Sequence, residues 1–106
     1  HEDINLITLL LSGSKPGLQA RDSDGAWHDI ACDPGMITIN NGDMLALATG
    51  NHFPSTTHRV TNPDAGQNVS RYSMPMFLHP RPDAPLTADV TADQYLQKRL
   101  KEIGLK

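Results

Sequence analysis

Short segments of apolar and branched residues alternate along this chain with clusters of Gly, Pro, Asn and Asp. Residues 4–11 are apolar on both faces, which predicts a strand that is covered on two sides. Residues 17–21 and 26–31 flank the turn sequence Asp22-Ser23-Asp24-Gly25, whose Asp-Gly step predicts a hairpin. Further strands are expected over residues 36–40, 44–49, 56–61 and 70–78. Strands this short and this closely spaced predict a mainly β fold, a sandwich or barrel of the jelly-roll kind.

The chain from residue 79 onward has a different texture. Residues 79–85 are rich in proline and cannot form a central strand, so we expect a linker or a packed arm. Thr91 and Gln94 have the spacing of a capping box, which predicts the start of a short amphipathic helix. Apolar residues then recur at helical spacing: Leu96, Leu100 and Ile103. We therefore divide the chain into a jelly-roll core over residues 1–86 and a linker with a C-terminal helix over residues 87–106.

Composition narrows the functional classes. The 106 residues form one small domain at most, and a formal charge of −3 offers no broad basic surface for nucleic acid. The longest apolar stretch, residues 6–11, is far shorter than the roughly 20 residues of a membrane-spanning helix. No secretory signal opens the sequence, and the single cysteine, Cys32, cannot form an internal disulfide. We therefore expect a cytoplasmic protein without a nucleic-acid or membrane partner, whose four methionines fill gaps in the core.

Two segments carry residues typical of a metal site. His1 and Asp3 are two positions apart, so in an extended chain both side chains point to the same side. His58 lies much further along, and a sandwich can bring such distant strands together. Two histidines and one carboxylate form the facial triad of non-haem Fe(II) oxygenases. For the triplet alone, surface histidines are the more common explanation, and His52, in a loop sequence, is a weaker candidate ligand.

A second pair, Arg71 and Ser73, also shares one face of a predicted strand. A guanidinium and a hydroxyl side by side can hold a carboxylate of a ligand through charge-assisted hydrogen bonds. An Arg beside a Ser is also typical of a solvated strand edge, so the pair alone decides nothing. Phe77, at the end of the same strand, is a candidate either for the wall of a substrate pocket or for the plain core.

In order and spacing, seven segments of the chain resemble the catalytic part of the isopenicillin N synthase-like family, above all its bacterial members. They are His1-Glu2-Asp3, Leu9-Leu10-Leu11, Gly17-Leu18-Gln19, Asn41-Gly42-Asp43, residues 55–60, residues 71–77 and residues 77–83. This family consists of Fe(II)- and 2-oxoglutarate-dependent oxygenases. The resemblance covers residues 1–86, which is all of the chain before the helical tail.

The resemblance implies a double-stranded β-helix, which is a cupin-like jelly roll. It implies that His1, Asp3 and His58 bind Fe(II), and that Arg71 and Ser73 bind the distal carboxylate of 2-oxoglutarate. The reaction would oxidise a small-molecule substrate, by hydroxylation or a related step, with O2 consumed and succinate and CO2 released. Members of the family are much longer than this chain and carry further strands and substrate contacts before the His-x-Asp motif. We therefore expect a fragment of a larger domain, whose missing N-terminal portion is needed for activity.

Two other functions stay open. An oxidase or cyclase of the same fold, such as isopenicillin N synthase, uses its Arg-x-Ser on the substrate and needs no 2-oxoglutarate. A non-catalytic jelly-roll binding module would carry the same residue types without using a metal. Succinate release coupled to turnover would exclude the oxidase, and loss of iron from a His58→Ala variant would exclude the binding module.

Overall fold

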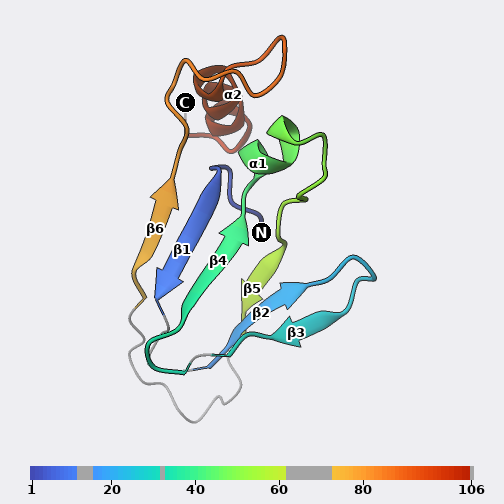
Figure 1. Ribbon diagram of the computed structural model, residues 1–106, viewed down its shortest axis with the longest axis vertical. Coiled ribbons are helices and arrows are strands. Elements are labelled where there is room, and N and C mark those ends of the chain that lie inside the picture. The colour runs from blue at the N-terminus through green and yellow to red at the C-terminus, as the bar shows by residue number, and fades with distance from the viewer. Residues whose placement is uncertain (12–15, 32, 62–72, 106) are drawn as a thin grey trace.

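The described residues of the chain, 1–11, 16–31, 33–61 and 73–105, form two antiparallel sheets and two helices in a computed structural model (Figure 1). The first sheet has the order β4-β1-β6 and consists of β1 (Ile7–Leu11), β4 (Ile37–Asn41) and β6 (Pro75–Leu78). The second has the order β3-β2-β5 and consists of β2 (Leu18–Arg21), β3 (Trp27–Asp29) and β5 (His58–Val60). The helices are α1 (Asp43–Ala48) and α2 (Ala92–Glu102). The mainly β architecture predicted from the sequence is confirmed.

Strand β1 is the centre of the first sheet, and its side chains alternate between the two faces. Thr8 lies opposite Asn40 of β4 and opposite Phe77 of β6, and these three residues line one cavity. On the other face, Leu11 is 49% exposed and Ile39 is 60% exposed. The prediction that β1 is covered on two sides therefore holds in part: on the outer face Ile7 and Leu9 are half-buried and Leu11 is exposed, and both helices pack at one end of the sheet rather than across it (Figure 1).

The four methionines also differ in how far they are exposed. Met44 fills the core, with 1% of its surface exposed. Met36, Met74 and Met76 are instead 43%, 69% and 60% exposed, because they lie in or directly before the edge strands β4 and β6. The expectation that all four methionines fill core gaps is wrong for these three.

The second sheet begins with the predicted hairpin, which is β2 and β3. Oδ1 of Asp22 accepts hydrogen bonds from the backbone N–H groups of Asp24 and Ala26, both at 2.9 Å, and so closes the turn. Strand β5 pairs with the other side of β2, with Ala20 opposite His58. The strands expected over residues 56–61 and 70–78 are confirmed in shorter form as β5 and β6, and residues 62–72 lie outside the described part of the chain.

Residues 44–49, predicted as a strand, form helix α1 instead. The helix from Asp43 to Ala48 consists mainly of Met, Leu and Ala, which are strong helix formers, and the first β-branched residue is Thr49 at the C-cap. A short apolar run does not distinguish a buried helix from a buried strand by its periodicity. After β4 the chain therefore continues through Gly42 into a helix instead of into another strand.

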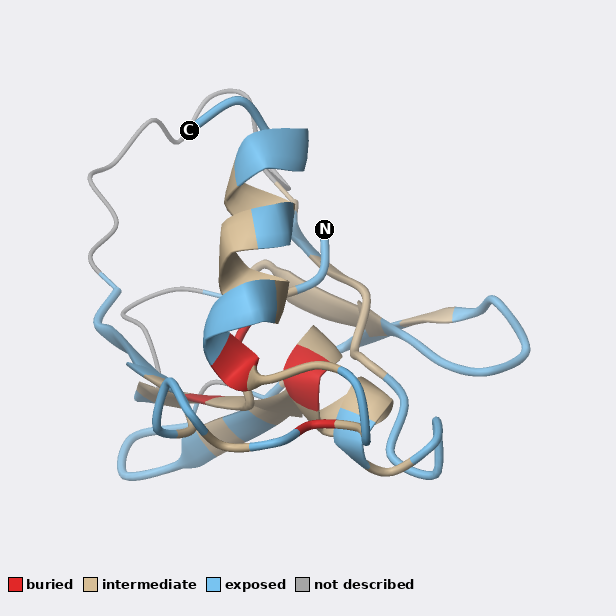
Figure 2. Ribbon diagram, turned by 90° about the horizontal axis from the view of Figure 1, so that it is seen from above, coloured by how far each residue is buried: buried red, intermediate tan, exposed pale blue. Residues whose placement is uncertain are grey.

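Helix α2 begins at the predicted capping box. The backbone N–H of Gln94 donates to Oγ1 of Thr91 (3.3 Å), and the backbone N–H of Thr91 donates to Oε1 of Gln94 (2.9 Å). The helix packs at the same end of the molecule as α1, over a core of Met44, Leu86 and Ala92 (Figure 2). In the part of the chain that is described, no helix has the length and apolar character needed to span a membrane. The division of the chain at residue 86 stays a prediction.

Candidate metal centre

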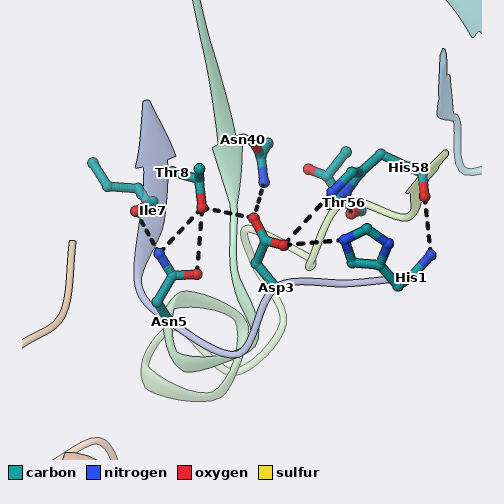
Figure 3. Close-up of polar contacts among 8 residues, drawn as sticks. All are labelled: His1, Asp3, Asn5, Ile7, Thr8, Asn40, Thr56 and His58. Atoms are coloured by element: carbon teal, nitrogen blue, oxygen red, sulfur yellow. Dashed lines mark hydrogen bonds and ion pairs between the residues drawn. The ribbon is translucent and has the colours of Figure 1, made fainter. Parts of the chain in front are cut away.

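Three predicted ligands, His1, Asp3 and His58, meet beside the start of β1 (Figure 3). Oδ1 of Asp3 lies 3.5 Å from Nε2 of His1 and 3.5 Å from Nε2 of His58. The two histidines are joined through their backbones, since the amino group of His1 donates to the carbonyl of His58 (2.9 Å) and the N–H of His58 donates back (3.0 Å). This pairing brings a residue of β5 next to the segment that leads into β1.

Hydrogen bonds from strands β1 and β4 hold one oxygen of the Asp3 carboxylate. Its Oδ2 accepts hydrogen bonds from Oγ1 of Thr8 (2.6 Å) and from Nδ2 of Asn40 (3.0 Å). Oδ1 is thereby turned towards the two imidazoles. The Asp3 side chain is only 9% exposed, so these contacts with strands β1 and β4 replace much of its contact with water.

The imidazole of His58 has a defined orientation. Its Nδ1 lies 2.9 Å from the carbonyl oxygen of Thr56. A carbonyl oxygen only accepts hydrogen bonds, so Nδ1 donates to Thr56 and Nε2 is the ring nitrogen that faces Asp3. The His58 side chain is 15% exposed, whereas that of His1 is 73% exposed. Second contacts of this kind are what orient metal-bound histidines in proteins.

The donor set fits a divalent transition metal. One ligand atom from each of His1, Asp3 and His58 lies within 4.8 Å of the others. Neighbouring ligands of an octahedral ion bonded at about 2.1 Å lie about 3 Å apart, so the 3.5 Å separations of the Asp3 oxygen from the two imidazoles need little closing. Two imidazoles and one carboxylate leave further coordination positions open, which is the arrangement of the Fe(II) facial triad. These residues therefore fit the iron ion that the sequence analysis expected.

A cavity of about 280 Å³ extends from the three ligands between the two sheets. The first sheet contributes Leu10 and Thr38, and the second contributes Leu18, Ala20 and Val60. Most of this wall is apolar. A molecule in the cavity would therefore contact mainly apolar side chains, with the three polar candidate ligands at one end.

The other predicted site residues have different outcomes. Ser73 and Phe77 both line the cavity, Ser73 from just before β6 and Phe77 from within it. Arg71 and Cys32 lie outside the described residues. His52 follows α1, and its ring packs edge-on against that of Phe53 at 4.7 Å rather than joining the three ligands.

Three supporting residues were not predicted: Thr8, Asn40 and Thr56. Thr8 is a single polar residue within the apolar run of residues 6–11, and such a position inside a strand is a signal worth following. Asn40 shows no comparable signal, because its contact with Asp3 depends on the register between β1 and β4.

Comparison with known proteins decides the family. Residues 1–80 match the family model described as the 2OG-Fe(II) oxygenase superfamily, in which 2OG stands for 2-oxoglutarate. The chain belongs to this superfamily. The superfamily's description names Fe(II) and 2-oxoglutarate, and an oxygenase uses O2, so the expected cofactors are confirmed for the family.

Solved structures of the superfamily have the same fold as this chain. A protein of Shewanella oneidensis assigned as an oxygenase is 50% identical with a TM-score of 0.89, over all of this chain and 40% of that one. A full-length protein of Neurospora crassa, solved in complex with alpha-KG, is 28% identical with a TM-score of 0.79, over 95% of this chain and 36% of that one. The predicted jelly-roll fold of the 2OG-Fe(II) oxygenases is thereby confirmed.

Curated relatives of this superfamily member are enzymes. The 2-oxoglutarate-dependent dioxygenase frbH of Dothideomycetidae sp. (strain 11243) is 37% identical over 89 residues, which are 83% of this chain and 27% of the relative. Scopoletin 8-hydroxylase of Arabidopsis thaliana is 34% identical over 82 residues, which are 77% of this chain and 22% of the relative. The chain thus spans about a quarter of the length of the curated relatives it matches.

Proposed function

We propose that the protein is an Fe(II)- and 2-oxoglutarate-dependent dioxygenase that oxidises a small molecule, by hydroxylation or a related reaction. In this reaction O2 is consumed, and succinate and CO2 are released. The observation that carries the proposal is the convergence of His1, Asp3 and His58 at one end of an apolar cavity, in a chain of the 2OG-Fe(II) oxygenase superfamily. A cytoplasmic location remains a prediction.

The chain's own residues would hold the metal and shape its surroundings. Fe(II) supplies the O2 chemistry that side chains lack. His58 offers the lone pair of Nε2, which its Nδ1 contact with Thr56 orients, and Asp3 offers Oδ1 and one negative charge. The apolar walls of the cavity would place the reacting atoms beside a surface of low polarity.

The remaining site residues have proposed roles along the same cavity. We assign Ser73, which lines it, to the distal carboxylate of 2-oxoglutarate together with Arg71. Phe77 lines the cavity from β6, opposite Thr8, and we assign it to the substrate wall. The largely apolar lining favours a substrate that presents a hydrocarbon part to the metal.

The first test is an anaerobic titration of the protein with Fe(II) and then with 2-oxoglutarate, monitored by the visible charge-transfer absorption of the chelate. We expect absorption that needs both reagents, is lost in His58→Ala and is weakened in Arg71→Ala. His52→Ala is the matched control, because His52 is an exposed histidine outside the three ligands and should leave the absorption unchanged.

Two other outcomes would overturn the proposal in different ways. Iron binding without any response to 2-oxoglutarate would favour an oxidase of the same fold. Absence of iron binding would favour a non-catalytic binding module. Release of succinate in step with O2 consumption, measured once a substrate is found, distinguishes the dioxygenase from both.

A further inference from the structure

A chain of buried polar side chains lies behind Asp3, on the side away from the two histidines (Figure 3). Thr8 is 3% exposed and Asn5 is 2% exposed, and they are the buried polar residues of the described part of the chain. Burying polar groups is unfavourable unless their hydrogen bonds are satisfied. Both side chains are therefore expected to have hydrogen-bond partners inside the protein.

The side-chain hydrogen bonds of this network are donated from Asn5 to Thr8 and from Thr8 to Asp3. Nδ2 of Asn5 donates to the carbonyl of Ile7 (2.7 Å) and to Oγ1 of Thr8 (3.1 Å). The Thr8 hydroxyl has one proton to donate. Its oxygen, Oγ1, lies 2.6 Å from Oδ2 of Asp3 but 3.4 Å from Oδ1 of Asn5. A carboxylate only accepts, so the Thr8 proton is directed to Asp3.

A second donor reaches the same oxygen from the neighbouring strand. Nδ2 of Asn40 lies 3.0 Å from Oδ2 of Asp3, and Asn40 lies opposite Thr8 in the sheet. The register between β1 and β4 thus places both donors on one carboxylate oxygen. With two hydrogen bonds on Oδ2, the oxygen that remains directed to the histidines is Oδ1.

We propose that Thr8 and Asn40 are positioning residues that make Asp3 a monodentate metal ligand. By occupying Oδ2, they present Oδ1 alone to the ion and keep one more coordination position free for a bound co-substrate. Asn5 is buried, and because its Nδ2 donates to Oγ1 of Thr8, the Thr8 proton is left to point to Asp3. This inference rests on the proposed function in one respect, namely that the three ligands bind a metal.

The decisive variant is Thr8→Val, which keeps the shape of the side chain and removes the donor. We expect its Fe(II) affinity, measured by anaerobic titration, to fall about 10- to 100-fold, the usual cost of losing an outer partner of a metal ligand. Thr8→Ser keeps the hydroxyl, and its Fe(II) affinity should lie within a few-fold of that of the protein without substitutions, here called the parent protein. Asn40→Ala should lower the affinity less than Thr8→Val, because its contact with Oδ2 is longer (3.0 Å against 2.6 Å).

A matched control lies on the same face of the same sheet. Thr38 lines the cavity from β4 but lies opposite Leu10 instead of opposite Thr8. Thr38→Val therefore removes a hydroxyl from the cavity wall without removing a donor to Asp3, and its Fe(II) affinity should equal that of the parent protein. Far-ultraviolet circular dichroism and a thermal melt of each variant show whether it is folded.

A second readout reports the binding mode itself. The infrared separation between the asymmetric and symmetric carboxylate stretches is larger for monodentate than for bidentate ligation. We expect Thr8→Val to narrow this separation for the metal-bound carboxylate, and Thr8→Ser to restore it. A structural role alone would change stability and leave this separation as it is.

The outcomes separate this inference from the proposed function. If the parent protein binds Fe(II) and folded Thr8→Val binds it equally well, the positioning role is wrong while the metal site stands. If the parent protein binds no Fe(II), both proposals fail together. Should Thr8→Val not fold, Asn40→Ala decides, and an unchanged affinity in that variant overturns the inference.

Discussion

Gly42 lies where the start of α1 touches the chain segment that carries Asp3. A Cβ atom at Gly42 would lie 2.0 Å from the carbonyl oxygen of Asn5, far inside van der Waals contact. The close approach lets backbone N–H groups at the helix start bind carbonyls of that segment, among them Asp43 N–H to Asp3 (2.8 Å) and Gly42 N–H to Leu6 (2.9 Å). The absence of a side chain at Gly42 thus allows the backbone of Asp3, a proposed metal ligand, to hydrogen-bond to the start of α1.

At this residue scale, we expect Gly42→Ala to lower the free energy of unfolding by about 2 to 3 kcal/mol, because Asn5 or the helix start must move. The backbone of Gly42 itself suits alanine, since its φ is −101°, so the cost is steric. Gly35→Ala is the contrast: a Cβ there meets nothing within 4 Å, but the φ of 86° is unfavourable for alanine and costs about 1 kcal/mol. Urea unfolding of both variants checks the order, and an equal loss would contradict the steric explanation.

At the scale of elements, the β2–β3 hairpin is closed by one carboxylate. Oδ2 of Asp22 lies 2.6 Å from Nε2 of His28, and its Oδ1 accepts from the two N–H groups of the turn. The hydrogen bond with His28 and that from the Ala26 N–H lower the pKa of Asp22 below its ordinary value of 3.8. The hairpin therefore favours the charged carboxylate.

The sign of the pH effect follows from this lowered pKa. The contribution of Asp22 to the hairpin is complete above pH 3.8 and is lost as the pH falls through the lower pKa of the folded state. We expect the amide signals of Asp24 and Ala26 in NMR spectra to shift together with a midpoint below 3.8, and Asp22→Asn to abolish that step. A midpoint at or above 3.8 would contradict the turn geometry.

At the scale of the whole molecule, the tightest apolar packing lies at the helical end rather than between the sheets (Figure 2). Met44 of α1, Leu86 between β6 and α2, and Ala92 of α2 form this core. The space between the sheets is instead the cavity beside the three proposed metal ligands. The residues of the apolar core thus lie largely apart from the residues of the candidate site.

A pair of methionine variants tests this separation. Met44→Ala should lower the free energy of unfolding by about 3 kcal/mol, because a side chain that is 1% exposed leaves a cavity in the core. Met76→Ala removes the same atoms from a residue that is 60% exposed, and the change should stay within about 0.5 kcal/mol. Thermal unfolding of both variants gives the comparison, and similar losses would place the core elsewhere.

The sequence predicted features that depend on neighbouring residues. The turn at Asp22 and the capping box of Thr91 and Gln94 were both correct, because each is made within a few residues. The residue types and the order of the surrounding motifs predict His1, Asp3 and His58 as ligands, and in the structure these three residues lie together.

Features that depend on tertiary placement were not predicted. The assignment of residues 44–49 to a strand was wrong, since length and composition of a short apolar run suit either element and burial against α2 decides. The support of Asp3 by Asn40 depends on strand register, which a one-residue shift would destroy. The exposure of Met76 depends on the position of β6 at the edge of a sheet whose outer face the helices do not cover.

The stacking of Arg59 on Trp27 gives the molecule an optical property. Trp27 is the single tryptophan of the sequence, and the Arg59 guanidinium lies 3.8 Å from its ring centroid, which holds the indole in place. Trp27 is in β3, and two strand spacings of about 5 Å each separate β3 from β5, where His58 begins the strand. Because Trp27 is the single tryptophan, indole emission reports on the contact between β3 and β5, the strand that carries His58, and loss of that contact on unfolding changes the emission.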